Sequence, residues 1–406
     1  MLSAKTIDLI TVGIDSPYPL QLEKVVAVRK RKALDFMKGR GLGAMVLSRL
    51  DNARFVSGLR PVISPWLINS YWAVLGIEGD LHLLVPSGDS RRMERTMPWI
   101  DEVVQFHSSR KLEIVSETLR EAGDRSGAIG YDSFEYDELR KLKRLMPRAK
   151  FVTVGNELLE VRARKLPEEI QVIRSGAKVT EQAVSFAVEM AKDGLKECEL
   201  AGMAENEARR LGAEGVSWSF ATFSGDHAGL MYRHDSEKRL KEGEFLILGY
   251  ATIYNGYNTD ITATTIVGER PNGEQKRLFS AVYESYREAL AMVKPGLTTQ
   301  SISERAAAVL REAGIPDSNS FVSFQPLIHG IGMNVYEPPF SPDPGARTPS
   351  TKLEPGHVLA VEPAVASFDK PSKGGVRIGE TLHLVDGGYE ILGRMPEKVI
   401  SIFSSR

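Results

Sequence analysis

The chain has 406 residues, too many for one ordinary hydrophobic core, so we expect two domains. Lysine and arginine total 52 against 53 acidic residues, a formal net charge of −1, so we expect no nucleic-acid or anionic-membrane partner. With one cysteine, no apolar run of membrane-spanning length and no basic-then-apolar start in MLSAKTIDLITVGID, the composition predicts a cytoplasmic protein without disulfide bonds.

The first part of the chain alternates predicted helices and strands. Residues 20–41 have the period of an amphipathic helix that ends in a glycine-rich turn. Residues 71–86 alternate and break at a Glu-Gly-Asp turn, as a hairpin would. Further predicted elements are the strands at 44–48 and 128–132 and the helices at 115–123 and 134–147. Such alternation predicts an α/β layer domain.

From about residue 150 the pattern changes to longer helices and apolar strands. Pro167, followed by Glu168 and Glu169, marks the start of a helix that we expect to run to Gly194. Other predicted helices lie at 196–212, 276–293 and 301–314. We place the domain boundary near residues 150–165, which gives domains 1–160 and 161–406.

The stretch from Phe245 to Thr265 combines two β-prone runs with a turn at Asn255-Gly256, which predicts a hairpin. Asp260 falls in the second run among threonines and isoleucines. A buried carboxylate needs a cation, a network of donors or a metal as partner. The alternative at this single position is an aspartate that caps a turn or faces solvent.

Three further polar residues lie in short apolar or glycine-rich settings: His329, Glu362 and Glu380. Each alone also has a structural explanation, since a His before Gly-x-Gly fills a turn, a Glu before Pro ends a strand, and Arg377 pairs with Glu380. Taken together, Asp, His and Glu on separate strands form a ligand set that suits a hard or borderline cation.

The order and wording of these segments resemble the creatinase, aminopeptidase P and prolidase superfamily. The segments that carry the resemblance are the helix at 20–38, LDNARFVSG (50–58), LPEEIQVIRSGAKVTEQA (166–183), SG-x-x-A (224–228), HGIGMNVYEPP (329–339), VEPAV (361–365) and VRIGETLHLV (376–385). The resemblance implies an α/β creatinase-type N-terminal domain and an α+β pita-bread C-terminal domain, in which helices flank a curved antiparallel sheet. It also implies a homodimer.

The chain departs from this family at the metal site. Metal-dependent members hold two divalent ions with two Asp, one His and two Glu, and three of these match Asp260, His329 and Glu362. The first Asp falls on Gly249 and the last Glu on Gly379. Glycine offers no side-chain ligand, so the usual dinuclear site cannot form. Glu380 is the next residue and, on a strand, should point to the opposite face.

The residues that assist at the substrate depart as well. The family's His that follows the His-Gly motif falls on Tyr336, and its upstream His falls on Tyr232 or, with a shorter loop, on His234. We expect Tyr232, Tyr336 and two further residues of the C-terminal strands, Arg377 and Glu380, to line the substrate pocket.

Our first hypothesis is a creatinase-like enzyme that hydrolyses a C–N bond in a small amide- or amidine-like molecule and needs no cofactor. One creatinase carboxylate matches Glu362 and the other falls on Thr262. His234 or His329 then acts as general acid or base, and Asp260 and Glu362 bind the substrate.

Two alternatives stay open. In the first, Asp260, His329 and Glu362 hold one divalent metal (Mn, Co, Fe or Zn) and support hydrolysis of a short Xaa-Pro peptide, or a lyase reaction. In the second, the pita-bread domain is an inactive scaffold that binds a partner. Buried charged groups argue for an enzyme, because a scaffold has no need of them.

Overall fold

The structure is a computed structural model, and it describes residues 22–60, 71–86, 88–123, 127–217, 221–231, 234–268, 270–342 and 350–404. Tyr232 therefore lies outside the described residues. The chain separates into two compact units, Met1–Arg162 and Ala163–Arg406, where the sequence places the division at residue 160. Within the ranges given above, no helix combines the length and the apolar character that crossing a membrane requires.

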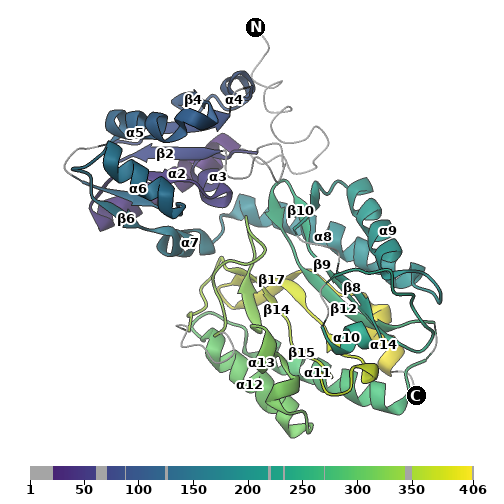
Figure 1. Ribbon diagram of the computed structural model, residues 1–406. Helices are drawn as coiled ribbons and strands as arrows, with labels where there is room; N and C mark the ends of the chain where they lie inside the picture. Colours follow the sequence, from purple (N-terminus) through teal and green to yellow (C-terminus); the bar gives the residue numbers. More distant parts are fainter. Residues whose placement is uncertain are drawn as a thin grey trace. The chain divides into compact units, whose positions relative to one another are not determined.

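The N-terminal unit contains one mixed six-stranded sheet in the order β4-β3-β2-β1-β5-β6, with helices packed against it (Figure 1). Strand β2 pairs antiparallel with β1 and β3, and the other pairs are parallel. The strands are β1 (Leu42–Leu47), β2 (Trp72–Gly76), β3 (Leu81–Pro86), β4 (Glu102–Phe106), β5 (Ala128–Tyr131) and β6 (Phe151–Thr153). The helices are α2 (Leu22–Arg40), α3 (Leu50–Ser57), α4 (Ser90–Thr96), η2 (Ser108–Arg110), α5 (Lys111–Ala122), α6 (Tyr136–Leu145) and α7 (Gly155–Ala163). The predicted α/β layers and the β2–β3 hairpin are confirmed.

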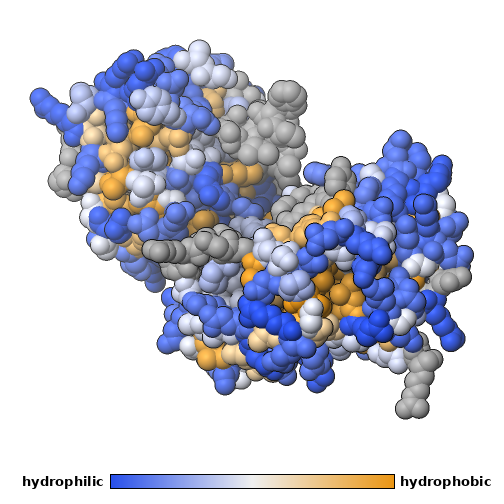
Figure 2. Space-filling view, turned by 60° about the horizontal axis from the view of Figure 1, so that its bottom comes forward, coloured by the Kyte–Doolittle hydropathy of each residue, from blue (hydrophilic) through white to orange (hydrophobic). Residues whose placement is uncertain are grey.

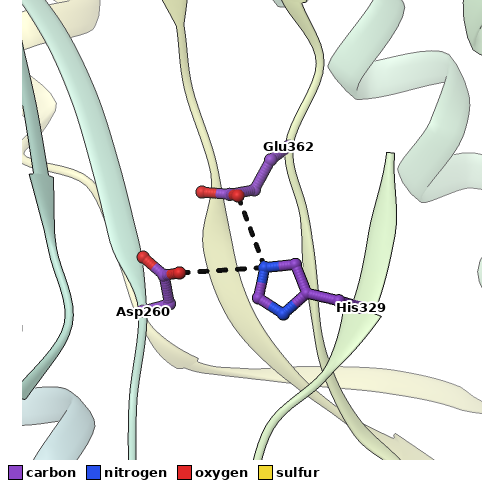
Figure 3. Close-up of side chains that lie close together, drawn as sticks. All are labelled: Asp260, His329 and Glu362. Atoms are coloured by element: carbon purple, nitrogen blue, oxygen red, sulfur yellow. Dashed lines mark hydrogen bonds and ion pairs between the residues drawn. The ribbon is translucent and has the colours of Figure 1, made fainter. Parts of the chain in front are cut away.

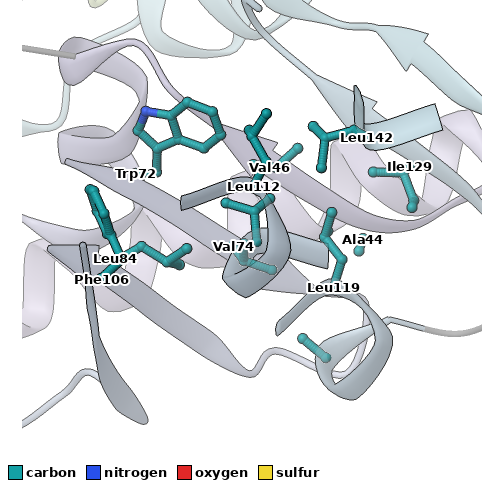
Figure 4. Close-up of a cluster of buried hydrophobic side chains, with 12 residues drawn as sticks. Ala44, Val46, Trp72, Val74, Leu84, Phe106, Leu112, Leu119, Ile129 and Leu142 are labelled. Carbon is teal, nitrogen blue, oxygen red and sulfur yellow. The ribbon is translucent and has the colours of Figure 1, made fainter. Parts of the chain in front are cut away.

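Two apolar cores cover the two faces of this sheet. Leu84 of β3 packs with Trp72 and with Leu112 of α5 in one cluster (Figure 4). Its neighbours Leu83 and Val85 pack in the other. Successive strand residues point to opposite faces, so an almost unbroken apolar run is what a sheet covered on both sides requires. Each fully buried Leu or Val contributes about 1.5–3 kcal/mol to the free energy of unfolding.

The C-terminal unit is built on antiparallel strands in two main sheets, β12-β9-β8 and β13-β14-β17-β18. A backbone bridge between Thr262 and Gly379 connects them. The strands of these sheets are β8 (Ala221–Ser224), β9 (Phe245–Tyr250), β12 (Ile261–Ile266), β13 (Ile328–Gly330), β14 (Val358–Val361), β17 (Glu380–Val385) and β18 (Gly388–Gly393). The smaller strands are β7 (Gly215–Val216), β10 (Thr252–Tyr254), β11 (Tyr257–Asn258), β15 (Ala364–Val365) and β16 (Val376–Arg377).

Helices flank these sheets as predicted (Figure 1). Helix α8 begins at Pro167, where the Glu169 carboxylate accepts a hydrogen bond of 2.7 Å from the Leu166 amide. It ends at Met190, four residues before the predicted end. The other helices are α9 (Glu197–Arg210), α10 (Asp226–Gly229), α11 (Gly273–Met292), α12 (Thr299–Glu312), η3 (Asp317–Asn319), α13 (Phe321–Phe324), η4 (Pro371–Lys373) and α14 (Glu397–Ser404). Figure 2 shows an apolar area on this unit surrounded by hydrophilic residues.

The stretch from Phe245 to Thr265 is more elaborate than the single predicted hairpin. β9 and β12 do pair antiparallel, but the chain between them forms a second, smaller hairpin of β10 and β11. Asn255 and Gly256 both have positive φ angles, 45° and 74°, as the predicted Asn-Gly turn requires. Asp260 is not inside a strand. It lies in the short connection between β11 and β12, immediately before β12 begins.

Candidate active site

Three titratable residues meet where strands of the two sheets begin or end. Asp260 directly precedes β12, His329 is the middle residue of β13, and Glu362 directly follows β14. Their exposed fractions are 3%, 0% and 1%. The Asp260 segment is held by Thr381, whose hydroxyl donates to the Asp260 carbonyl at 2.7 Å and accepts from its amide at 3.2 Å. The Thr381 hydroxyl therefore holds the backbone from which the Asp260 side chain extends.

The Nε2 atom of His329 faces both carboxylates (Figure 3). It is 3.4 Å from Glu362 Oε2 and 3.7 Å from Asp260 Oδ2. Burial by itself lowers the pKa of His329, but the hydrogen bond and charge of Glu362, followed by the charge of Asp260, outweigh it and raise this pKa. The imidazole is therefore a site where positive charge is stabilised.

Glu362 is held by donors on both carboxylate oxygens. Thr262 Oγ1 donates to Oε1 at 2.8 Å, and Arg377 Nη2 donates a short charged hydrogen bond to Oε2. Burial alone raises the pKa of Glu362, but Arg377 and His329 together keep it well below the ordinary value. Burial likewise lowers the pKa of Arg377, and Glu362 more than reverses this. Both partners are therefore charged.

Tyr336 covers the other side of His329. The two rings stack with centroids 4.0 Å apart and planes inclined by 11°. The loop that carries Tyr336 is closed by backbone hydrogen bonds between Gly330 and Glu337. Glu337 in turn forms a buried ion pair with Lys165, with Nζ and Oε1 2.7 Å apart. Tyr336 is partly exposed, so it lies between the buried cluster and the surface.

One predicted site residue, Glu380, points away from this cluster. The Glu380 carboxylate turns to the opposite face of the sheet, where it accepts hydrogen bonds from the Tyr286 hydroxyl at 2.6 Å and the Met395 amide at 3.0 Å. Its suggested pairing with Arg377 is wrong, because Arg377 bonds to Glu362. His234 is exposed on the loop after α10. Glu380 therefore drops out of the substrate-binding set on geometric grounds.

Thr262 donates a hydrogen bond to Glu362, a role that was not predicted from the sequence. A signal was present, since the resemblance places the second creatinase carboxylate at Thr262. The buried pair of Lys165 and Glu337 was also missed. Nothing in the sequence brings together two residues that are 172 positions apart.

The cluster offers enough ligands for one divalent ion but not for two. Ligand atoms of Asp260, His329 and Glu362 lie within 4.8 Å of one another, and two oxygens with one nitrogen suit a divalent ion. The two positions where the resemblance expects further ligands, Gly249 and Gly379, have no side chain. A Cβ added at Gly379 would lie 2.5 Å from Glu362 Cγ. The cluster therefore fits one ion and does not fit two.

Comparison with known families agrees with this fold. Residues 171–386 match the model of metallopeptidase family M24, and residues 29–164 match the creatinase/prolidase N-terminal domain. The chain therefore belongs to metallopeptidase family M24, and the predicted superfamily and pita-bread architecture are confirmed. The prediction of a hydrolase of C–N bonds is confirmed at this level. The predicted homodimer and the cytoplasmic location stay predictions.

Individual relatives are similar over almost their whole length. An Xaa-Pro dipeptidase of Pyrococcus horikoshii is 26% identical over 370 residues, which cover 91% of this chain and 98% of the relative. An Xaa-Pro dipeptidase of Pyrococcus furiosus is 26% identical, with 92% and 99% covered. Among solved structures, the prolidase from Pyrococcus horikoshii superposes with a TM-score of 0.78 at 25% identity, covering 92% of this chain and 99% of that one. The Xaa-Pro dipeptidase from Bacillus anthracis gives 0.79 at 22%, with 91% and 98% covered, which supports the fold.

Proposed function

We propose that this protein hydrolyses the amide bond of a short peptide of the Xaa-Pro type at the cluster of Asp260, His329 and Glu362, with one divalent ion (Mn, Co, Fe or Zn). The single observation that carries the proposal is the convergence of three buried ligand atoms within 4.8 Å. The names of the relatives, Xaa-Pro dipeptidases, support this peptidase hypothesis better than the creatinase-like one that the sequence analysis ranks first.

Asp260, His329 and Glu362 would hold the ion, which when bound supplies Lewis-acid polarisation of a carbonyl and lowers the pKa of water. Arg377 and Thr262 fix the direction of the Glu362 carboxylate and keep it ionised, so that it accepts hydrogen bonds and does not deliver a proton. Tyr336 stacks on His329 and sets the plane of the imidazole. Its partly exposed ring is in a position to meet the substrate.

A second candidate is metal-free hydrolysis of a C–N bond. The observation that favours it is the charge balance of the cluster, in which Arg377 and a protonated His329 match the charges of Asp260 and Glu362. In that case His329 delivers its Nε2 proton to the leaving nitrogen.

The experiment that separates the two uses protein purified without added metal. Hydrolysis of Xaa-Pro dipeptides, and of matched dipeptides without proline, is followed before chelation, after chelation and after Mn, Co, Fe or Zn is restored. We expect hydrolysis of the proline substrates to stop on chelation and to return with one of the ions. Turnover that survives complete chelation would establish the metal-free candidate. Failure to hydrolyse any dipeptide under all these conditions would contradict the peptidase proposal.

A further inference from the structure

Residues 330–337 form a loop that returns on itself and carries Tyr336 over His329, and we call it the stacking loop. The Gly330 amide donates to the Glu337 carbonyl at 2.7 Å, and the Glu337 amide donates to the Gly330 carbonyl at 3.2 Å. These two hydrogen bonds bring the first and last residues of the loop together. The position of Tyr336 therefore depends on the contacts that hold its neighbour Glu337.

The Glu337 side chain is held by Lys165, which lies just before helix α8. Lys165 Nζ is 2.7 Å from Glu337 Oε1, and the two side chains have exposed fractions of 2% and 1%. The same Nζ donates to the Ala163 carbonyl at 3.0 Å. The other carboxylate oxygen, Oε2, accepts from the Asn334 amide of the loop at 3.3 Å. The ion pair therefore connects the stacking loop to the segment that leads into α8.

The ion pair and the loop are packed directly against each other. The Lys165 amide donates to the Gly356 carbonyl at 2.9 Å, which fixes the backbone from which the lysine extends. A Cβ added at Gly332 would lie 2.1 Å from Glu337 Oε1 and 2.7 Å from Lys165 Cε. The Gly332 carbonyl accepts from the Asn258 amide at 2.7 Å and from its Nδ2 at 3.0 Å. The middle of the loop therefore lies between Asn258 and the ion pair.

The gain in stability from such a pair does not explain its presence. The cost of taking two charges out of water offsets much of their attraction, and apolar residues of similar volume often stabilise a core as well. A charged hydrogen bond is, however, shorter and stronger than a neutral one, so it also fixes the distance between its two partners. A buried ion pair between Lys165 and Glu337 is therefore best explained by the placement of the loop that it holds.

We propose that Lys165 is a positioning residue that, through Glu337, holds the stacking loop so that Tyr336 lies flat on His329. The stack has a centroid distance of 4.0 Å and an interplanar angle of 11°, a geometry that a small shift of the loop would remove. The inference rests on the proposed function for its effect on hydrolysis. Its effect on the loop is measured without substrate, so a failure to hydrolyse peptides leaves that result unaffected.

The first test is amide hydrogen exchange of wild type and Lys165→Met, followed by mass spectrometry of peptides. Methionine keeps most of the volume of the lysine stem and removes the charge. We expect exchange within residues 330–337 to rise by about tenfold or more, because the loop loses the contact that holds Glu337. Peptides from β9 and β12 should exchange as in the wild type. Unchanged exchange in the loop, or an equal rise throughout the C-terminal unit, would overturn the proposal.

The second test asks whether Lys165 acts through Tyr336. The values of kcat and KM for dipeptide hydrolysis are measured for Lys165→Met, Tyr336→Ala and the double variant, at equal folded fraction. We expect each single variant to lower kcat/KM by about tenfold or more, with kcat and KM changed in the same proportion in both. In the Tyr336→Ala background, Lys165→Met should cost less than about threefold more, since the ring that it places is absent. Losses that multiply in the double variant would overturn the proposal.

Lys238→Met is the matched control, because it removes the cation of another ion pair in the same unit. Lys238 Nζ is 2.6 Å from Glu244 Oε2, with exposed fractions of 20% and 24%. Exchange in the stacking loop and kcat/KM should both stay within about threefold of the wild type. Equal effects in the two lysine variants would overturn the proposal. Should Lys165→Met not fold, Glu337→Gln takes its place with the same expectations, since it removes the other charge and keeps the shape.

Discussion

Two buried glutamates near the paired strands β14 and β17 lie on opposite faces of one sheet and behave in opposite ways. Glu362 meets Arg377, His329 and Thr262, and its pKa is held well below the ordinary value. Glu380 meets the Tyr286 hydroxyl and the Met395 amide, and burial raises its pKa. The two have exposed fractions of 1% and 5%. The contrast teaches that depth does not decide the ionisation of a buried carboxylate, whereas the charge of its neighbours does.

The surroundings of the two glutamates also suggest different roles, one in a catalytic site and one in holding the fold together. Glu362 is surrounded by groups that carry charge and can exchange ligands or protons, as catalytic centres require. Glu380 accepts its hydrogen bonds from two neutral donors, which join β17 to helix α11 and to the segment before α14. We expect substitutions on the two faces to divide accordingly between activity and stability.

The largest expected effect comes from replacing the two glutamates one at a time. Glu362→Gln keeps the shape but removes the charge that pairs with Arg377 and that would hold the proposed ion, so kcat/KM should fall by about 100-fold or more. Glu380→Gln should keep kcat/KM within about threefold, because its carboxylate does not reach the cluster. Dipeptide hydrolysis is measured for both at equal folded fraction. Equal losses in the two variants would remove the distinction between the faces.

A smaller effect is expected from adding a methyl group at Gly379, next to Glu362. Gly379→Ala places a methyl group where Glu362 lies and should reduce the free energy of unfolding by about 1–3 kcal/mol, with a further loss of activity. Gly249→Ala is the matched control, because its Cβ meets only ordinary contacts. Urea unfolding gives both values. If Gly379→Ala is as stable and active as Gly249→Ala, Glu362 does not need that space.

Two buried histidines extend the comparison to pH. His357, just before β14, lies near Lys165 and Arg164, and burial followed by these charges lowers its pKa from 6.5 to about 4, opposite to His329. The unfolded chain then binds more protons between these values, so stability present above pH 6.5 is lost as pH falls towards 4. This histidine should account for about 2 kcal/mol between pH 7 and pH 5. Urea unfolding of wild type and His357→Asn measures it, and identical pH dependence in the two would contradict it.

The smallest effect is expected at the single hydrogen bond from Thr262 to Glu362. Thr262→Val keeps the shape and removes the donor, which should cost about 1–1.5 kcal/mol in stability or about tenfold in kcat/KM. Thr262→Ser keeps the hydroxyl and should remain within about threefold of the wild type in kcat/KM. Steady-state kinetics of both variants decide whether the hydroxyl or the methyl group matters.

The sequence by itself determined the architecture, because local signals and the tertiary fold agree. The capped start of α8 at Pro167, the alternation in β2 and β3 and the Asn-Gly turn at residue 255 all form as predicted. It also singled out Asp260, His329 and Glu362, which the structure brings within 4.8 Å of one another, because polar residues in apolar or glycine-rich runs are few. Their role in catalysis stays a prediction. The two-residue period of a strand was also enough to predict that Glu380 points to the face opposite to that of Gly379.

Tertiary structure decided how these residues are used. The pairing of Arg377 with Glu362 across 15 positions, and the contact of Thr262 with Glu362 across 100, depend on how two sheets meet at the bridge from Thr262 to Gly379. From the sequence, Gly379 shows only that a metal ligand of the family is missing. In the fold, the absence of a side chain at Gly379 leaves the space in which the Glu362 side chain lies. The reason is physical: residue type sets which interactions are possible, and long-range packing sets which of them are made.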